Sequence, residues 1–384
     1  MHFTNQATVF EVYNPFSILQ LSEVLNDFRI VIGERTLYAG RGVVSSLVNT
    51  GIMLVCEATL VDAWNDVDIL SLIKDTTLFR DEIKRFVGDW KINNNILPEF
   101  KVLTSDFQGF LSELSMWFKP LETPIPQLMP EASERLSMEV VDKAVEPLRP
   151  IAIEFLQKLE LLAGEIPPER AGIHKAYLRR DLHPLTLCSP FVHRSFTKPL
   201  GYAGDYEMIN MILERQYEGR TLFAKTVNKL LLDTAPAEAH RNRITILKRL
   251  LEQESERARA SGQALEVLNI GCGPAKEVRD FMAASRNADL CRMTLMDFSK
   301  DALEFAQRKA LEHKARTGSK IQLEFVEKSI DDLLRESMAR ARETSAKRYD
   351  FVYCAGLFDY FTDSVCRRLI ALFYEWLVPG GLLS

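Results

Sequence analysis

A pair of glycines after a short apolar run is the feature of this sequence that most directly indicates chemistry. Leu265–Ile270 has the pattern of a buried strand, Gly271 and Gly273 follow at once, and Ala275–Ala284 has a helical pattern. Glycines let the backbone approach a ligand closely, and the first turn of a helix leaves N–H groups free to bind it. The pattern predicts a loop that binds a nucleotide-type ligand, with Cys272 inside it as a small filler and not a nucleophile.

An acidic residue ends the next predicted strand. Asp297 closes the run Met293–Asp297, 26 positions after Gly271. In a parallel strand, helix, strand unit, the end of the second strand lies beside the first loop, where a carboxylate accepts both hydroxyls of a ribose. Asp297 is therefore the predicted sugar-binding residue, with Phe298 beside it as a further cofactor contact.

Two further strands, Ile321–Val326 and Tyr349–Cys354, are expected to end at the same edge. The carboxyl ends of parallel strands form a crevice, and substrate chemistry is predicted where the second of these strands ends. The residues predicted to line this edge are Ser329 and Ile330 at the adenine, Ala355 and Gly356 at the rest of the cofactor, and Asp359 and Tyr360 for catalysis.

The loop differs from the dinucleotide fingerprint G-x-G-x-x-G, because Lys276 stands where the third glycine would fall, so hydride transfer is disfavoured. Four features occur in order: Glu266 before the loop, the glycine pair, Asp297 and the Leu377–Gly381 turn. Together they resemble class I S-adenosylmethionine-dependent methyltransferases, over residues 265–384. The resemblance implies an α/β, Rossmann-like sheet and S-adenosylmethionine as the cofactor.

A narrower resemblance spans most of the chain. Lys198–Asn210 together with Ala355–Tyr360 is similar to a bacterial group that makes 3-hydroxy fatty acid methyl ester signals. This implies methyl transfer to the carboxylate of a hydroxy fatty acid, for quorum sensing. The alternative is a catalytically impaired regulatory protein that binds S-adenosylmethionine or senses a nucleotide.

The acceptor decides whether a base is needed. Methyl transfer is an in-line displacement for which an enzyme supplies positioning and electrostatics, and a carboxylate acceptor needs no general base. An amine or hydroxyl acceptor would need one, and His183, His193 and Asp359 are the candidates. Arg243 or Arg241 is predicted to pair with the carboxylate of cofactor or substrate, against the alternative of a solvated charged face.

The stretch His183–Asp205 is loop-like and rich in aromatic and polar residues. Tyr202, Asp205 and Tyr206 are predicted to form a lid over the cofactor, which either binds its amino-acid end or faces the sulfonium with aromatic surface. Tyr202 is also a predicted catalytic residue. The alternative is a helix cap at Asp205 with packed tyrosines.

Pattern changes divide the chain into four predicted parts. Tyr38–Gly51 resembles a degenerate PilZ barrel, but Val48 stands where that family has serine and its arginine pair is missing, so a structural or dimerising role is favoured. The predicted parts are a small β-barrel-like domain at 1–65, a helical region at 66–182 with a proline-rich linker at 119–130, a helical cap at 183–260 and the methyltransferase core at 261–384.

Composition is that of a soluble globular protein, with 47% hydrophobic and 26% charged residues. A net charge of -5 argues against nucleic acid, and six scattered cysteines indicate reduced thiols in the cytoplasm. No apolar run is long enough to span a membrane. A small lipid-like acid is the expected partner, no metal is expected, and a homodimer is left open. Because a class I sheet has seven strands and this chain stops as the fifth begins, the sheet is expected to be truncated and its activity reduced.

Overall fold

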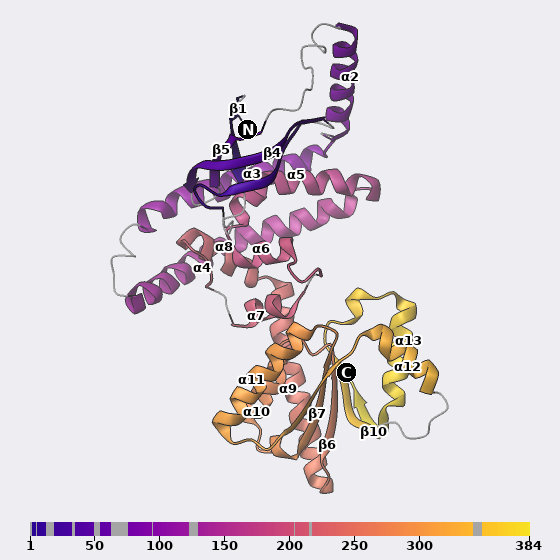
Figure 1. The fold of residues 1–384 in the computed structure, drawn as a ribbon. Helices are drawn as coiled ribbons and strands as arrows, with labels where there is room; N and C mark the ends of the chain where they lie inside the picture. The colour runs from indigo at the N-terminus through magenta and orange to yellow at the C-terminus, as the bar shows by residue number, and fades with distance from the viewer. Residues whose placement is uncertain are drawn as a thin grey trace. The chain divides into compact units, whose positions relative to one another are not determined.

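The computed structural model describes most of the chain, which forms two compact units (Figure 1). Unit 1 comprises Met1–Thr197 and Gln216–Leu232, and unit 2 comprises Lys198–Arg215 and Asp233–Ser384. The described residues are 2–4, 6–12, 19–32, 35–49, 54–62, 76–93, 95–122, 130–202, 204–214, 217–340 and 348–384.

Unit 1 begins with an antiparallel sheet, as the short β-like runs predict. Buried and more exposed residues alternate along its fifth strand, as expected for a sheet with one face in the core. The buried residues of this strand are Leu54, Cys56, Ala58 and Leu60. The strands, in the spatial order β1-β2-β5-β4-β3, are β1 His2–Phe3, β2 Ala7–Val12, β3 Val24–Ile32, β4 Arg35–Asn49 and β5 Leu54–Leu60.

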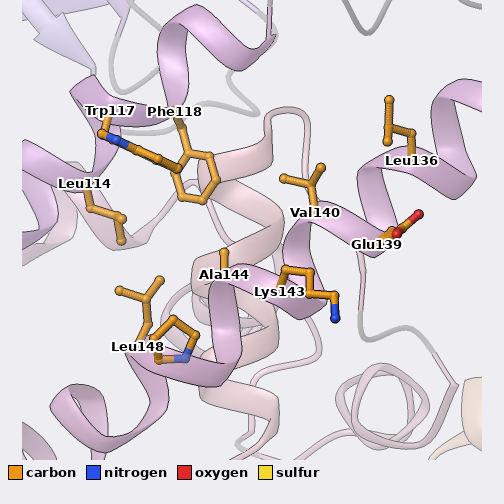
Figure 2. Close-up of a pocket in the computed structure, with 10 residues that line it drawn as sticks. Leu114, Trp117, Phe118, Leu136, Glu139, Val140, Lys143, Ala144 and Leu148 are labelled. Atoms are coloured by element: carbon orange, nitrogen blue, oxygen red, sulfur yellow. The ribbon is translucent and has the colours of Figure 1, made fainter.

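Helices form the rest of unit 1. Buried residues of α3, α4, α5 and α8 share one apolar cluster. The helices are α2 Thr76–Asn93, α3 Pro98–Glu122, α4 Pro130–Glu165, α5 Pro168–Thr186, α6 Pro190–Thr197 and α8 Leu222–Leu232. A groove of about 510 Å³ between α3 and α4 is lined mostly by apolar side chains, among them Leu114, Trp117, Val140 and Leu148 (Figure 2).

The prediction based on the proline-rich segment needs correction, and a second helix also contains proline. Helix α3 continues through Pro120 to Glu122, so the predicted linker does not begin at residue 119, and residues 123–129 lie outside the described part. Helix α4 passes through Pro147 and Pro150 without ending there. Burial of Val141 and Val145 in the shared cluster supports α4 by tertiary packing, which outweighs the local cost of proline.

The expected loop from His183 to Asp205 is also largely helical. His183 lies in the last turn of α5, and α6 occupies Pro190–Thr197. Proline is favoured in the first turn of a helix, and the Ser189 hydroxyl accepts the Val192 N–H at 3.3 Å, so the Ser-Pro pair begins a helix here.

Unit 2 is built on a parallel sheet with the strand order β10-β9-β6-β7-β8, which confirms the predicted α/β, Rossmann-like fold. The central strand β6 carries the glycine loop at its carboxyl end. The strands are β6 Leu265–Ile270, β7 Cys291–Asp297, β8 Gln322–Glu327, β9 Tyr349–Cys354 and β10 Leu377–Leu383. The expected fifth strand is β10, and its pairing with β9 shifts register between Leu377 and Leu382.

Helices cover both faces of this sheet (Figure 1). Val267 of β6 packs in a cluster with residues of α9, α10 and α11, whereas Leu268 packs in a second cluster with residues of α12 and α13. Because successive side chains of a strand point to opposite faces, one strand can join two cores. The helices are α7 Tyr206–Glu214, α9 Ala235–Ser261, α10 Lys276–Ala284, α11 Lys300–Thr317, α12 Ile330–Arg340 and α13 Asp363–Glu375.

Candidate functional site

The glycine loop turns sharply between β6 and α10. Gly271 and Gly273 have φ values of 69° and 51°, in the left-handed region where only glycine is free of strain. The N–H groups of Gly271 and Cys272 donate to Met296 O at 2.8 and 3.0 Å, which ties the loop to the end of β7. A side chain built on Gly273 would meet nothing within 4 Å. The loop is therefore fixed in place and open at Gly273.

Asp297 anchors this loop from the neighbouring strand. Its Oδ2 accepts the Gly273 N–H at 2.9 Å, and its Oδ1 accepts the Ser299 N–H at 2.9 Å. Burial raises the pKa of Asp297, and the backbone hydrogen bonds oppose that shift. Each carboxylate oxygen has a second lone pair, so Asp297 keeps acceptor capacity for a ligand hydroxyl beside the loop.

The structure places the other predicted residues of the β8 edge close to this anchor. The Lys328 N–H donates to Asp297 O at 2.9 Å. Ser329 precedes α12, where its hydroxyl donates to Asp332 at 2.6 Å, and Ile330 packs with the apolar cluster beneath α12 and α13. Ser329 thus caps the start of α12, at the position predicted to border the adenine.

The segment Lys198–Glu214, of which Ala203 is not described, belongs to unit 2, and we call it the strap. The Tyr202 ring lies 5.2 Å from the Phe298 ring, centroid to centroid, and the Tyr206 ring lies 5.2 Å from the Phe305 ring. The Met208 N–H donates to Asp205 Oδ1 at 2.9 Å, so Asp205 caps α7 as one of the two predicted alternatives requires. Burial raises the pKa of Tyr202 above its ordinary value.

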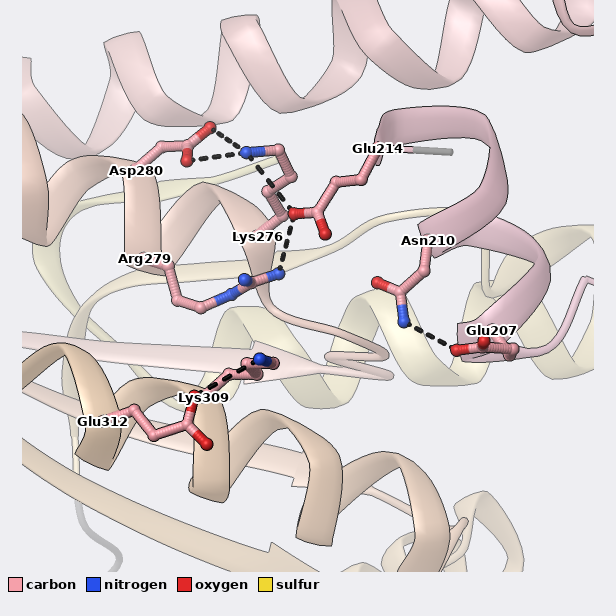
Figure 3. Close-up of polar contacts among 8 residues, drawn as sticks. All are labelled: Glu207, Asn210, Glu214, Lys276, Arg279, Asp280, Lys309 and Glu312. Carbon is pink, nitrogen blue, oxygen red and sulfur yellow. Dashed lines mark hydrogen bonds and ion pairs between the residues drawn. The ribbon is translucent and has the colours of Figure 1, made fainter. Parts of the chain in front are cut away.

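Ion pairs hold the other end of the strap (Figure 3). Glu214 at the end of α7 lies 3.8 Å from Lys276 Nζ and 3.5 Å from Arg279 Nη2, both in the first turns of α10. Arg241 of α9 donates to Ile212 O at 3.4 Å. The strap therefore contacts the helix that follows the glycine loop.

The segment after β9 also approaches the strap. A Cβ on Gly204 would lie 2.5 Å from the Tyr360 hydroxyl, so Tyr360 of the β9 edge approaches the strap backbone closely. Burial, followed by the charge of Asp359, raises the pKa of Tyr360. Asp359 itself is exposed, and a Cβ on Gly356 would lie 2.6 Å from Arg243 Nη1. The structure thus gathers Tyr360, Gly356 and Arg243 around one edge.

The contact at Gly204 can be tested against a neighbouring glycine. Gly201 and Gly204 both have positive φ, but a Cβ on Gly201 would meet nothing within 4 Å. Gly204→Ala and Gly201→Ala should both cost about 1–2 kcal/mol in backbone strain. Only Gly204→Ala should move the Tyr360 ring outward and increase its nitration by tetranitromethane, mapped by mass spectrometry. Equal nitration of Tyr360 in both variants would contradict the contact.

Sequence reasoning missed a buried polar network beneath the loop. Glu277 of α10 is 4% exposed, and its Oε1 accepts hydrogen bonds from Asn269 Nδ2 and from the Tyr353 hydroxyl, each at 2.9 Å. It ties the ends of β6 and β9 to the first turn of α10. The signal was present, because Asn269 is a polar residue inside an otherwise apolar strand, and such a residue needs a partner when buried.

The structure also places the remaining predicted residues. Glu266 lies before the loop, near the amino end of β6, and pairs with Arg292 at 3.1 Å. Cys272 is buried, and burial raises the pKa of its thiol well above the usual value, consistent with a filler. His183 and His193 belong to helices of unit 1, and burial lowers the pKa of both.

One family model matches part of unit 2. Residues 267–381 match the family model described as a methyltransferase domain. No curated protein matches the sequence. None of the described helices has the length and hydropathy that a membrane crossing requires.

Solved structures similar to this chain share limited regions with it. Magnesium protoporphyrin IX methyltransferase from Synechocystis PCC 6803, with bound S-adenosylhomocysteine, is 17% identical over 34% of this chain and 51% of its own, with a TM-score of 0.24. A protein of Bordetella parapertussis described as a possible exported protein is 18% identical over 67% and 73%, with a TM-score of 0.37. The glycopeptide N-methyltransferase MtfA, complexed with sinefungin, is 20% identical over 34% and 47%, with a TM-score of 0.24.

This chain thus spans about half the length of the first of these proteins. The family match covers β6 to β10 almost completely, and these are the strands that carry the glycine loop and Asp297. Residues 267–381 are therefore similar to a methyltransferase domain, and they lie on an α/β, Rossmann-like sheet.

Proposed function

We propose that this chain transfers the methyl group of S-adenosylmethionine to the carboxylate of a small, lipid-like acid. One observation carries the proposal: the Asp297 carboxylate lies beside the open glycine loop, where its Oδ2 accepts a hydrogen bond from the Gly273 N–H at 2.9 Å. A nucleoside sugar lying on this loop would meet that carboxylate. The cofactor would extend from Ser329 at the adenine, past the loop, to Ala355 and Gly356 at the end of β9.

The groups around the proposed transfer position fit an acceptor that is already ionised. Burial raises the pKa of Tyr202 and of Tyr360, so both phenols keep the proton with which a phenol can donate a hydrogen bond to an acceptor. A carboxylate acceptor uses such donors and needs no base. The displacement forms a bond from a carboxylate oxygen to the methyl carbon while the sulfonium bond breaks, leaving neutral S-adenosylhomocysteine.

Aromatic surface supports the lipid-like character of the acceptor. Phe298 is 52% exposed and Tyr360 is 51% exposed, and both lie at the carboxyl edge of the sheet beside the strap. Exposed aromatic rings beside a cofactor site suit an apolar chain. The similarity of Lys198–Asn210 and Ala355–Tyr360 to the methyl ester group supports a hydroxy fatty acid as the acceptor and a signalling ester as the product.

The N-terminal sheet is proposed to be a structural, PilZ-like domain. Arg41, which lies between Gly40 and Gly42 in β4, is already engaged, because its Nη2 lies 3.0 Å from Asp62 Oδ1 and its N–H donates to Asp62 Oδ2 at 2.6 Å. An arginine held by a carboxylate of its own domain is a poor receptor for a nucleotide phosphate. This observation favours scaffolding over nucleotide sensing.

The full chain should be incubated with S-adenosylmethionine labelled in the methyl group and with 3-hydroxy fatty acids of several lengths. Labelled methyl ester is the expected product, and it should be absent with Asp297→Ala. Intact binding of S-adenosylhomocysteine without transfer to any acid would overturn the acceptor assignment and leave the regulatory alternative.

A further inference from the structure

Arg241 and Arg243 of α9 both lie near the proposed site, and of the two only Arg241 has an ion-pair partner among the described residues. Arg241 Nη2 lies 2.7 Å from Glu238 Oε2 and also donates to the strap at Ile212 O. Arg243 is half-buried, and no carboxylate among the described residues lies within ion-pair distance of it. A partly desolvated guanidinium without a carboxylate partner is costly unless a ligand supplies one.

The guanidinium of Arg243 lies over the backbone at the end of β9. A Cβ on Gly356 would be 2.6 Å from Nη1 and 3.7 Å from Cζ, so the missing side chain at Gly356 makes the room that Arg243 occupies. Gly356 has a φ of 83°. Both the position and the conformation therefore favour glycine there.

The charges around Arg243 leave it as the dominant local cation. His240 lies one turn earlier on the same face of α9, and burial followed by the charge of Arg243 lowers the pKa of His240, so this imidazole is neutral near pH 7. Asp359 acts on His240 in the opposite direction but does not reach ion-pair distance of Arg243. A small anion at Arg243 would thus meet one fixed positive charge.

Strand spacing relates this cation to the sugar position. The order β9-β6-β7 puts the end of β9 two strand spacings from Asp297, which is about 10 Å, with the glycine loop between them. In S-adenosylmethionine, the sulfonium and a short aliphatic chain separate the ribose from the amino-acid carboxylate, and in an extended conformation they cover a comparable distance. A cofactor with its ribose at Asp297 would bring that carboxylate toward Arg243.

We infer that Arg243 binds the amino-acid carboxylate of the cofactor and does not bind the acceptor. The inference rests on the proposed function. It assigns the planar fork of the guanidinium to a bidentate pair with that carboxylate, above Gly356. The acceptor is then left to the strap side of the edge, near Tyr202, Phe298 and Tyr360.

The test compares two nucleosides that differ in the amino-acid group. S-adenosylhomocysteine has the carboxylate, whereas 5′-methylthioadenosine keeps the ribose, adenine and sulfur without it. Calorimetry on the full chain should show Arg243→Gln lowering the affinity for S-adenosylhomocysteine about 10- to 100-fold, with the affinity for methylthioadenosine unchanged. Arg243→Lys should give an intermediate loss, and the exposed Arg249→Gln on the same helix should change neither affinity.

Each outcome decides the inference. Unchanged methylthioadenosine binding also shows that the variant is folded. Equal losses for both nucleosides, or no loss for either, would overturn the role of Arg243 while leaving the proposed function standing. If the wild-type chain binds neither nucleoside, the proposed function and this inference fail together.

Discussion

Asp297→Ala is expected to lower the affinity for S-adenosylhomocysteine by about 100-fold or more, measured by calorimetry. The change removes the acceptors proposed for the ribose hydroxyls, and it also releases the Gly273 N–H, which donates to Oδ2 at 2.9 Å. Hydrogen bonds to a charged group contribute about 1.5–3 kcal/mol each, so the loss of two corresponds to a factor of about 10²–10⁴. The loss should appear with methylthioadenosine too, since that ligand keeps the ribose.

Matched variants distinguish a specific loss of nucleoside binding from a loss of folded protein. Asp301→Ala removes an exposed carboxylate in the first turn of α11 and should leave nucleoside affinity unchanged. In wild type, the two carboxylate oxygens of Asp297 accept hydrogen bonds from two backbone N–H groups, and Asp297→Asn keeps only one acceptor oxygen. The nucleoside affinity of Asp297→Asn should therefore fall between those of wild type and Asp297→Ala. Wild-type affinity in the alanine variant would show that the ribose does not lie at Asp297.

Glu277→Ala is expected to destabilise unit 2 by about 2–6 kcal/mol. The substitution leaves Asn269 Nδ2 and the Tyr353 hydroxyl as buried donors without their acceptor, and each such group costs about 1–3 kcal/mol. Hydrogen exchange at β6 and β9 measures this loss in unit 2 alone. Glu277→Gln keeps an acceptor oxygen at the same place and should retain most of the stability. Exchange rates in Glu277→Ala equal to wild type would contradict the network.

The same residue predicts a pH dependence with a definite sign. Burial raises the pKa of Glu277 above the ordinary value of 4.5 for a glutamate carboxyl. Below about pH 4.5 the carboxyl is protonated in both the folded and the unfolded chain, and no cost arises. As the pH rises through the folded pKa, the folded chain must bury an anion, so stability falls. The stability of Glu277→Gln relative to wild type should therefore grow as the pH rises through this window, and a constant difference would contradict the burial effect.

The strands and the loop of unit 2 could be predicted from the sequence. Apolar runs ending in Gly271, Asp297 and Cys354 specify buried parallel strands, because such strands are apolar on both faces and end at one edge. The local conformation at Gly271 and Gly273 follows from residue type, since glycine alone adopts positive φ without strain. The fold class and the glycine loop are thus determined by short segments of the sequence.

The strap and the network beneath the loop depended on the tertiary structure. Tyr202 meets Phe298 across 96 sequence positions, and Glu277 meets Tyr353 across 76. Arg241 and Arg243 are equivalent candidates in the sequence, yet the fold gives one a partner and places the other over Gly356. The prolines of α4 likewise had to be judged against its buried face. Local sequence determines conformation and strand ends, whereas the pairing of distant side chains depends on how helices pack on the sheet, which no single segment encodes.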